Sequence, residues 1–84
     1  MTMGIYQILN KNNGKRYIGS SNNIKLRFYH HKNLLRKNAH HSKHLQASWD
    51  KNGEFVFDFN IVEKVDKEDD LIERETHYFL LYGF

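Results

Sequence analysis

The first twenty residues carry the pattern of a β-hairpin. Gly4–Asn10 reads as a strand, and Lys15–Ser20 reads as a second strand that returns beside it. Between them, Asn13-Gly14 is a strong turn signal, because both residues tolerate the positive φ of a type I′ turn. We therefore expect two antiparallel strands joined by a type I′ turn.

A helix is predicted directly after the hairpin. Apolar residues recur at helical spacing from Ile24 onwards, and the pattern continues to about Lys37. Ser20, Ser21 or Asn22 can cap its N-terminus, because each carries a side-chain oxygen that accepts a backbone N–H. A polar loop of residues 38–41 separates this helix from the next element.

The following segments predict a shorter helix and a third strand. Ser42 is a candidate N-cap, the helix should end at Asn52, and Gly53 suits the cap position beyond it. Alternate residues then have the period of a half-buried strand, and they are Phe55, Phe57, Phe59 and Ile61. The aromatic members of this ladder and Trp49 are expected in the core.

The last helix is predicted to have Asp66 as its N-cap and to run to about Tyr82. Acidic residues 68–70 occupy its first turn, where negative charge interacts favourably with the helix dipole. The chain is therefore expected to form one α+β domain over residues 1–84, in the order β-β-α-α-β-α.

Three polar residues are predicted to lie on apolar helix faces. Arg27 and His31, four residues apart, fall in the same sector as the apolar stripe of the first helix, which consists of Ile24, Phe28, Leu34 and Leu35. Glu75 projects near the centre of the stripe of the last helix, which consists of Leu71, Ile72, Tyr78, Phe79 and Tyr82. A carboxylate facing a core needs a paired cation or a bound metal. Two alternatives remain open: an Arg27–Glu75 ion pair that ties the helices together, or an active site.

Composition and charge narrow the function classes. Cysteine is absent, which excludes disulfides, cysteine-based zinc sites and a cysteine nucleophile. No apolar run approaches the ~18–20 residues of a membrane span and no secretory signal pattern is present, so an intracellular, cytoplasmic protein is expected. The net charge of +3 is unevenly spread: segment 11–51 holds most of the Lys and Arg, five of the six His, and one acid, Asp50. This half can attract a polyanion such as nucleic acid, although a solvated basic face is the simpler explanation.

The tripeptides Gly4-Ile5-Tyr6 and Tyr17-Ile18-Gly19 resemble the signature of the GIY-YIG nuclease family. They are accompanied by polar residues at spacings similar to those of phage-type homing endonucleases in this family, namely Arg27, His31, His40 and Glu75. The segment around Lys51-Asn52-Gly53 and the segment 70–75 also resemble the family's pattern. The resemblance spans nearly the whole chain, and it implies a three-stranded antiparallel sheet flanked by helices.

The resemblance also implies a chemistry, the hydrolysis of DNA phosphodiester bonds with one divalent ion, Mg²⁺ or Mn²⁺. Glu75 would hold the ion, and Arg27 would contact the scissile phosphate. Tyr6 would act as general base, with His31 accepting or relaying its proton. Tyr17 would orient the water, and His40 belongs to the same set of site residues.

The implied partner is double-stranded DNA, cut with little intrinsic sequence preference by a monomer or a weak dimer. Specificity would then come from a separate or missing domain, and a phage-encoded protein would act in the cytoplasm of its bacterial host. Candidate phosphate contacts are Lys25, Lys32, Arg36 and Lys43. The alternatives are a non-catalytic nucleic-acid-binding module of the same fold, a structure-specific repair nuclease, and an interaction domain in which Arg27 and Glu75 only form an ion pair.

The chain departs from the family pattern at its C-terminal end. Family members commonly have an Asn in a short segment after the glutamate-bearing helix, and no such residue occurs before Phe84. Either the C-terminal end of the domain is truncated or the domain is unusually short.

Overall fold

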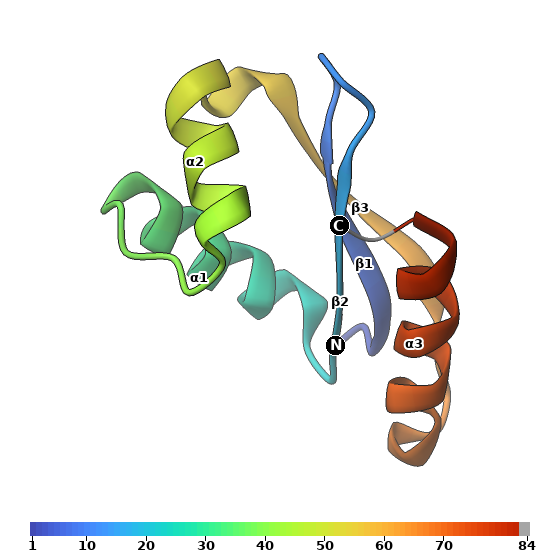
Figure 1. Cartoon of the computed structure of the whole chain (residues 1–84). Helices are drawn as coiled ribbons and strands as arrows, with labels where there is room; N and C mark the ends of the chain where they lie inside the picture. The colour runs from blue at the N-terminus through green and yellow to red at the C-terminus, as the bar shows by residue number, and fades with distance from the viewer. Residues whose placement is uncertain (83–84) are drawn as a thin grey trace.

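Three strands form one antiparallel sheet at the centre of the computed structural model, which describes residues 1–82 (Figure 1). The strands are β1 (Gly4–Asn10), β2 (Arg16–Ser21) and β3 (Phe57–Lys64), and their order across the sheet is β2-β1-β3. Both pairings of β1 are antiparallel. The predicted three-stranded antiparallel sheet is confirmed, and β2 and β3 are its two edges.

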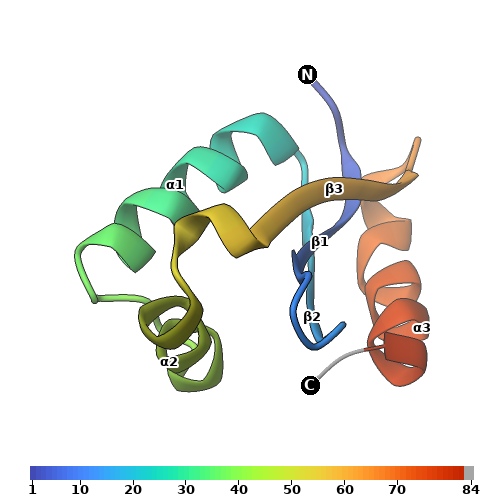
Figure 2. The same cartoon turned by 90° about the horizontal axis from the view of Figure 1, so that it is seen from above.

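Helices cover both faces of this sheet. Helices α1 (Ile24–Arg36) and α2 (Lys43–Asn52) lie on one side, and α3 (Leu71–Tyr82) lies on the other, as the view from above makes clear (Figure 2). Two short 3₁₀ turns, Glu54–Val56 and Glu68–Asp70, precede β3 and α3. The predicted order β-β-α-α-β-α is confirmed. Across residues 1–82, none of the helices combines the length and the apolar character needed to cross a membrane.

Each face of the sheet has its own core, because side chains alternate along the strands. The larger core lies under α1 and α2 and consists of Tyr6, Ile8, Ile24, Leu35, Leu45, Trp49 and Phe57. The smaller core lies under α3 and consists of Ile5, Ile18, Val65 and Leu71. Much of α3 remains in contact with solvent, and Ile72 and Leu80 are 79% and 78% exposed. The predicted apolar stripe of α3 is therefore wrong for Ile72 and also for Phe79 and Tyr82, which are exposed as well.

The cap of α2 is confirmed and the caps of its neighbours are not. Ser42 accepts a hydrogen bond from the Leu45 N–H, and Gly53 ends the helix at a positive φ of 87°. The N-cap of α1 is Asn23, one residue beyond the predicted candidates, and its side chain accepts the Leu26 N–H. Asp66 does not cap α3, because residues 68–70 form a 3₁₀ turn ahead of the helix.

Two further expectations about local structure are wrong. The hairpin forms, but its turn is not type I′: Gly14 has a positive φ and Asn13 does not. The connection is longer, and the Asn10 carbonyl accepts the Gly14 N–H across four residues. Phe55 lies in the 3₁₀ turn before β3 and is 92% exposed, whereas Phe57 and Trp49 are buried as expected.

Candidate active site

The candidate site forms around the edge strand β2, between α1 and α3 (Figure 1). Tyr17 packs against the core under α1 and α2, while Ile18 belongs to the core under α3. Side chains from the two faces of the sheet can meet here, because β2 is an edge of the sheet that residues 1–82 form. The middle Ile of each tripeptide, Ile5 and Ile18, thus packs under α3, and each tyrosine faces the opposite layer.

The glycines of the tripeptides admit close approaches that a side chain would block. Gly19 pairs with Tyr6 across β1 and β2, and a Cβ at Gly19 would lie 2.5 Å from the Tyr6 Cζ atom. A Cβ at Gly4 would collide with the Glu63 backbone, beside the bulge where β1 and β3 shift register. Gly19 therefore makes room for the Tyr6 ring, and Gly4 makes room for β3.

One pocket of about 170 Å³ brings most of the predicted site residues together. Its lining consists of Tyr6, Tyr17, Gly19, Ser20, Arg27, His31, His41 and Glu75. Five of the six predicted catalytic residues therefore share one cavity. The sixth, His40, is buried and contacts the pocket through its hydrogen bond to His31.

Arg27 and Glu75 reach this pocket from opposite layers, and they are not paired. Arg27 is exposed, so its predicted place on the buried stripe of the helix is wrong; it lies at the rim instead. Glu75 is half-buried and accepts a hydrogen bond from the Ser20 hydroxyl. Among residues 1–82 no ion pair joins Arg27 to Glu75. The ion-pair alternative is thus not what the side chains form.

The two tyrosines are bonded to histidines, and burial raises the pKa of both. The Tyr6 hydroxyl lies 2.5 Å from His31 Nε2, and the Tyr17 hydroxyl lies 3.0 Å from His41 Nε2. The Arg27 guanidinium acts in the opposite direction and lowers both tyrosine pKa values, but the effect of burial is larger. Both side chains are therefore phenols at neutral pH.

The buried histidines are neutral. Burial lowers the pKa of His31 to about 3, and the neighbouring charges of His40 and Arg27 act in the same direction. Burial also lowers the pKa of His40 to about 4, with His41 as the next cause. At pH 7 both rings are uncharged hydrogen-bonding groups.

Two residues of the site were not predicted from the sequence. His41 was placed in the polar loop of residues 38–41; it is exposed, but it bonds Tyr17 and stacks on His40, with ring centroids 4.4 Å apart. Ser20 was considered only as a helix cap, whereas its hydroxyl binds Glu75. Its position two residues after Ile18, on the same face of β2, is the signal that could have placed it opposite α3.

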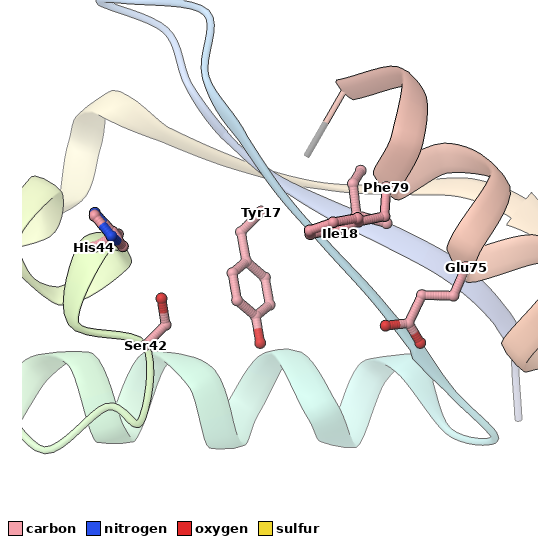
Figure 3. Close-up of a pocket in the computed structure, with 6 residues that line it drawn as sticks. All are labelled: Tyr17, Ile18, Ser42, His44, Glu75 and Phe79. Atoms are coloured by element: carbon pink, nitrogen blue, oxygen red, sulfur yellow. The ribbon is translucent and has the colours of Figure 1, made fainter. Parts of the chain in front are cut away.

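Further pockets adjoin the site and share residues with it. A pocket of about 300 Å³ lies between α2, β2 and α3, where the Tyr17 hydroxyl and the Glu75 carboxylate project into the same space (Figure 3). It continues through His44 into a groove between the hairpin tip and α2. A third pocket begins at Arg27 and extends along the start of α1. Each of these pockets shares at least one lining residue with another, and we refer to the four together as the trough.

Comparison with known proteins places the chain in a family. The model of the GIY-YIG catalytic domain matches residues 2–84. The chain belongs to the GIY-YIG family. The intron-associated endonuclease 1 of Enterobacteria phage T4 is 43% identical over 79 residues, which are 93% of this chain and 32% of that protein. The chain thus spans about a third of the length of this curated relative.

Solved structures agree with this membership. The catalytic domain of the intron endonuclease I-TevI, E75A mutant, has a TM-score of 0.89 and 36% identity, covering 100% of this chain and 92% of that one. A second structure of the catalytic domain of the homing endonuclease I-TevI also has a TM-score of 0.89, with 35% identity over 98% of this chain and 95% of that one. This GIY-YIG domain is therefore a homologue of a homing-endonuclease catalytic domain, and the predicted family and fold are confirmed.

Glu75 is the only carboxylate among the described residues that line the site pocket of this GIY-YIG domain. Among residues 1–82 no three His, Cys, Asp or Glu side chains gather into a metal-binding group. GIY-YIG nucleases are metal-dependent as a class. A hard divalent cation such as Mg²⁺ suits a single protein carboxylate, because it keeps several waters and takes phosphate oxygens as further ligands. The donor set therefore fits such an ion.

Two of the four predicted phosphate contacts, Lys32 and Arg36, interact with other side chains of the domain. Arg36 forms a bidentate ion pair with Glu54, and the Lys32 ammonium lies 4.8 Å from the centre of the Phe59 ring. Both interactions are on the β3 side of the sheet, opposite β2. Lys25 and Lys43 are exposed. Contact of these four residues with nucleic acid stays a prediction.

The buried histidines should make the stability of the domain fall with acidification. In the unfolded chain a histidine binds a proton near pH 6.5, whereas folded His31 and His40 do so at about 3 and 4. Between these values the unfolded state binds more protons, so the free energy of unfolding drops by about 1.4 kcal/mol per pH unit for each ring. Glu54 and Glu63, whose pKa values are lowered by Arg36 and Arg74, add to the loss only below about pH 4.5.

Urea unfolding at several values between pH 7 and pH 4.5 measures this slope. His31→Gln removes one buried ring and should flatten it by about half. His44→Gln, which replaces an exposed ring, is the matched control and should leave the slope unchanged. A slope that is the same in all three proteins contradicts the assignment.

Proposed function

We propose that this domain hydrolyses phosphodiester bonds of double-stranded DNA, with one Mg²⁺ or Mn²⁺ ion bound at Glu75. The observation that carries the proposal is the meeting of Arg27, Glu75 and the Tyr6–His31 pair in one open pocket at the edge of the sheet. Among residues 1–82 the Arg27 guanidinium and the Glu75 carboxylate form no ion pair, and these two groups beside a phenol suit the hydrolysis of a phosphodiester. The similarity to endonuclease catalytic domains supports the same activity.

The lining of the trough is an argument for a long anionic substrate, one that extends on both sides of the site. Of the residues that line its four pockets, Glu75 is the sole carboxylate. Lys15 and Lys51 line its far end, between the hairpin tip and α2, and Arg27 lines the other. The other acidic residues of β3 and α3, which are Asp58, Glu63 and Glu73, are absent from the linings of these pockets. Positive charge along such a path attracts the sugar–phosphate backbone, which dominates the affinity of most DNA-binding proteins.

Arg27 and the tyrosines have distinct roles in the proposed reaction. Water attacks phosphorus, the bond from phosphorus to the 3′ oxygen breaks, and negative charge grows on the phosphate oxygens. The Arg27 guanidinium, exposed at the rim, is placed to bind these oxygens as the charge grows. Tyr6 is proposed to accept the proton of the attacking water, and Tyr17, bonded to His41, to orient that water.

Glu75 is proposed to bind the divalent ion, and the hydroxyl of Ser20 holds the Glu75 carboxylate in position. A hydrogen bond to a carboxylate oxygen fixes the rotamer of the ligand and tunes its basicity, as outer-shell partners do at metal sites. When bound, the ion polarises the phosphate and neutralises charge on the departing oxygen. Arg27 and Glu75 thus act on the same phosphate from the two layers of the fold.

Cleavage of supercoiled plasmid tests the proposal. With Mg²⁺ or Mn²⁺ the domain should nick and then linearise the plasmid, and a chelator should stop the reaction. Arg27→Ala should lower the rate by about a hundredfold or more, because a donor to the developing charge is lost. Lys37→Ala, which replaces an exposed cation at the C-terminal end of the same helix and outside the pockets, is the control and should cut at nearly the parental rate.

Binding to a short duplex in chelator separates this function from its rivals. Lys15→Glu with Lys51→Glu should weaken binding and reduce its salt dependence, whereas Lys64→Glu with Lys67→Glu changes the charge equally outside the trough. Binding without cleavage under any metal would instead favour a non-catalytic module. A strong preference for branched DNA would favour a structure-specific repair nuclease.

A further inference from the structure

A chain of three hydrogen bonds connects the backbone of α2 to the phenol of Tyr6. The Ser42 N–H donates to His40 Nδ1 at 3.0 Å. His40 Nε2 lies 2.7 Å from His31 Nδ1, and His31 Nε2 lies 2.5 Å from the Tyr6 hydroxyl. These hydrogen bonds begin at Ser42, the N-cap of α2, continue through His31 of α1 and end at Tyr6 in the site.

The first of these bonds fixes the direction of the other two. A backbone amide can only donate, so His40 Nδ1 must be the acceptor and carry no hydrogen. A neutral imidazole has one N–H, which in His40 is therefore on Nε2 and is donated to His31 Nδ1. By the same reasoning the hydrogen of His31 is on Nε2, and it is donated to the Tyr6 oxygen.

This deduction requires both rings to be neutral, and their surroundings keep them so. His31 and His40 are 3% and 7% exposed, and their pKa values of about 3 and 4 lie far below neutral pH. No carboxylate bonds to either ring within residues 1–82. A second proton on either imidazole would lack a partner of opposite charge.

The loop that carries His40 is tied in place around this chain. The His40 N–H donates to the side-chain oxygen of Gln46, whose amide nitrogen donates to the Leu35 carbonyl and to Asp50. Gln46 is itself buried. Hydrogen bonds to both helices thus hold the loop between α1 and α2, and the Ser42 N–H points in a fixed direction.

We propose that the Ser42 amide sets the polarity of these three hydrogen bonds, meaning their direction from donor to acceptor, so that His31 donates to Tyr6 and does not take its proton. Ser42 and His40 are then positioning residues, acting on Tyr6 through His31. This inference rests on the proposed function for its catalytic meaning, but the polarity itself does not. It replaces the expectation that His31 accepts or relays the Tyr6 proton.

The polarity dictates where protons travel. With one lone pair of its oxygen bonded by His31, Tyr6 turns its own O–H toward the pocket that it lines. Tyr6 therefore loses that proton to solvent through the pocket, and the phenolate formed accepts the proton of the attacking water. The departing 3′ oxygen takes one proton from solvent, which replaces the one that Tyr6 released, so hydrolysis uses one water, leaves a 5′ phosphate and a 3′ hydroxyl, and stores no proton on a histidine. The His31 N–H stabilises the phenolate throughout.

Long-range ¹H–¹⁵N spectra of the histidine rings, recorded on the whole protein, test the polarity of the hydrogen bonds without any need for activity. We expect His31 and His40 to be neutral at pH 7 with hydrogen on Nε2 in both. Hydrogen on Nδ1 of His31, or a doubly protonated ring, overturns the inference even if the protein cuts DNA. A protein that cuts no DNA but shows the expected tautomers retains the inference and loses the proposed function.

Two substitutions at Ser42 separate the amide from the hydroxyl. Ser42→Ala and Ser42→Pro both remove the side-chain cap of Leu45, but only proline removes the N–H, and its ring suits the Ser42 φ of −86°. The alanine variant should keep the parental tautomers. The proline variant should gain an Nδ1–H form of His40 and lose about tenfold in kcat, with KM little changed, since a wrong tautomer beside intact geometry impairs catalysis. Identical tautomers in the two variants would overturn the role of the amide.

Substitution of His31 gives a second readout that does not depend on the proline variant folding. His31→Gln keeps an N–H that can donate to Tyr6 and should stay within about tenfold of the parental kcat, whereas His31→Leu should lose about a hundredfold. Equal losses in both variants would indicate that His31 acts as a base.

Discussion

Glu75→Gln should abolish plasmid cleavage, with a loss of about a thousandfold or more, while the domain stays folded and still binds duplex DNA. The amide has the shape of the carboxylate and can still accept the hydrogen bond from Ser20, so the geometry of the site is retained. The negative charge that attracts a divalent cation is lost. Single-turnover cleavage, measured with duplex binding in chelator, distinguishes lost chemistry from lost affinity.

Glu73→Gln is the matched control for this substitution. Glu73 lies two residues earlier on α3 and is exposed, so the same loss of charge occurs outside the pocket. The control should cut like the parent. If Glu75→Gln cut at the parental rate, the proposed metal site would have to be abandoned, whatever the behaviour of Arg27→Ala.

Gly19→Ala should reduce both stability and activity, although it adds one methyl group. The methyl carbon would lie 2.5 Å from Tyr6 Cζ, and the Tyr6 ring is 2% exposed and packed edge-on against Phe28, so it cannot move aside freely. Overpacking of this kind costs about 1–3 kcal/mol. Displacement of the phenol should also lower the cleavage rate by about tenfold or more. Urea unfolding and plasmid cleavage measure the two effects.

A double-mutant cycle attributes the loss to this contact. In a Tyr6→Leu background the ring is absent, so adding Gly19→Ala should cost much less stability than it does in the parent. Equal costs in the two backgrounds would show that the glycine is needed for a different reason.

Local signals predicted the elements of this fold well where one residue decides the outcome. Ser42 and Gly53 bracket α2 as expected, because their conformations suit the ends of a helix whatever packs around it. The hairpin turn was wrong in type because asparagine side chains compete for the backbone: Asn10 and Asn13 accept the N–H groups of Asn12 and Lys15. Such competition depends on the whole loop.

Positions that depend on tertiary packing were predicted less well. Phe55 continues the alternation of β3 but lies in a 3₁₀ turn, since the period alone does not say where a strand begins. Arg27 was expected on a buried stripe and lies at the rim, because the rotation of α1 against the sheet decides exposure within one turn of helix. Five of the six residues that the family resemblance selected line one pocket, and their roles in catalysis stay predictions.

His41 illustrates what the sequence does not encode locally. Its bond to Tyr17 depends on the return of the loop between α1 and α2, where Asn38 has a φ of 57° and Gln46 anchors His40. No periodicity marks these residues. The loop is positioned by the buried Gln46 and by the fold of both helices, which become evident only in three dimensions.

The separation of the two cores has a consequence for how the domain would fail. Arg27 and the histidine chain rest on the larger core, whereas Glu75 rests on α3 and the four residues of the smaller one. Regions with few buried contacts open at lower free energy than the molecule as a whole. Mild denaturant or heat should therefore detach the carboxylate from the guanidinium while the other layer is still native. Loss of cleavage would then precede the loss of Trp49 fluorescence, and enzymatic half-life would report on the weakest layer of the molecule.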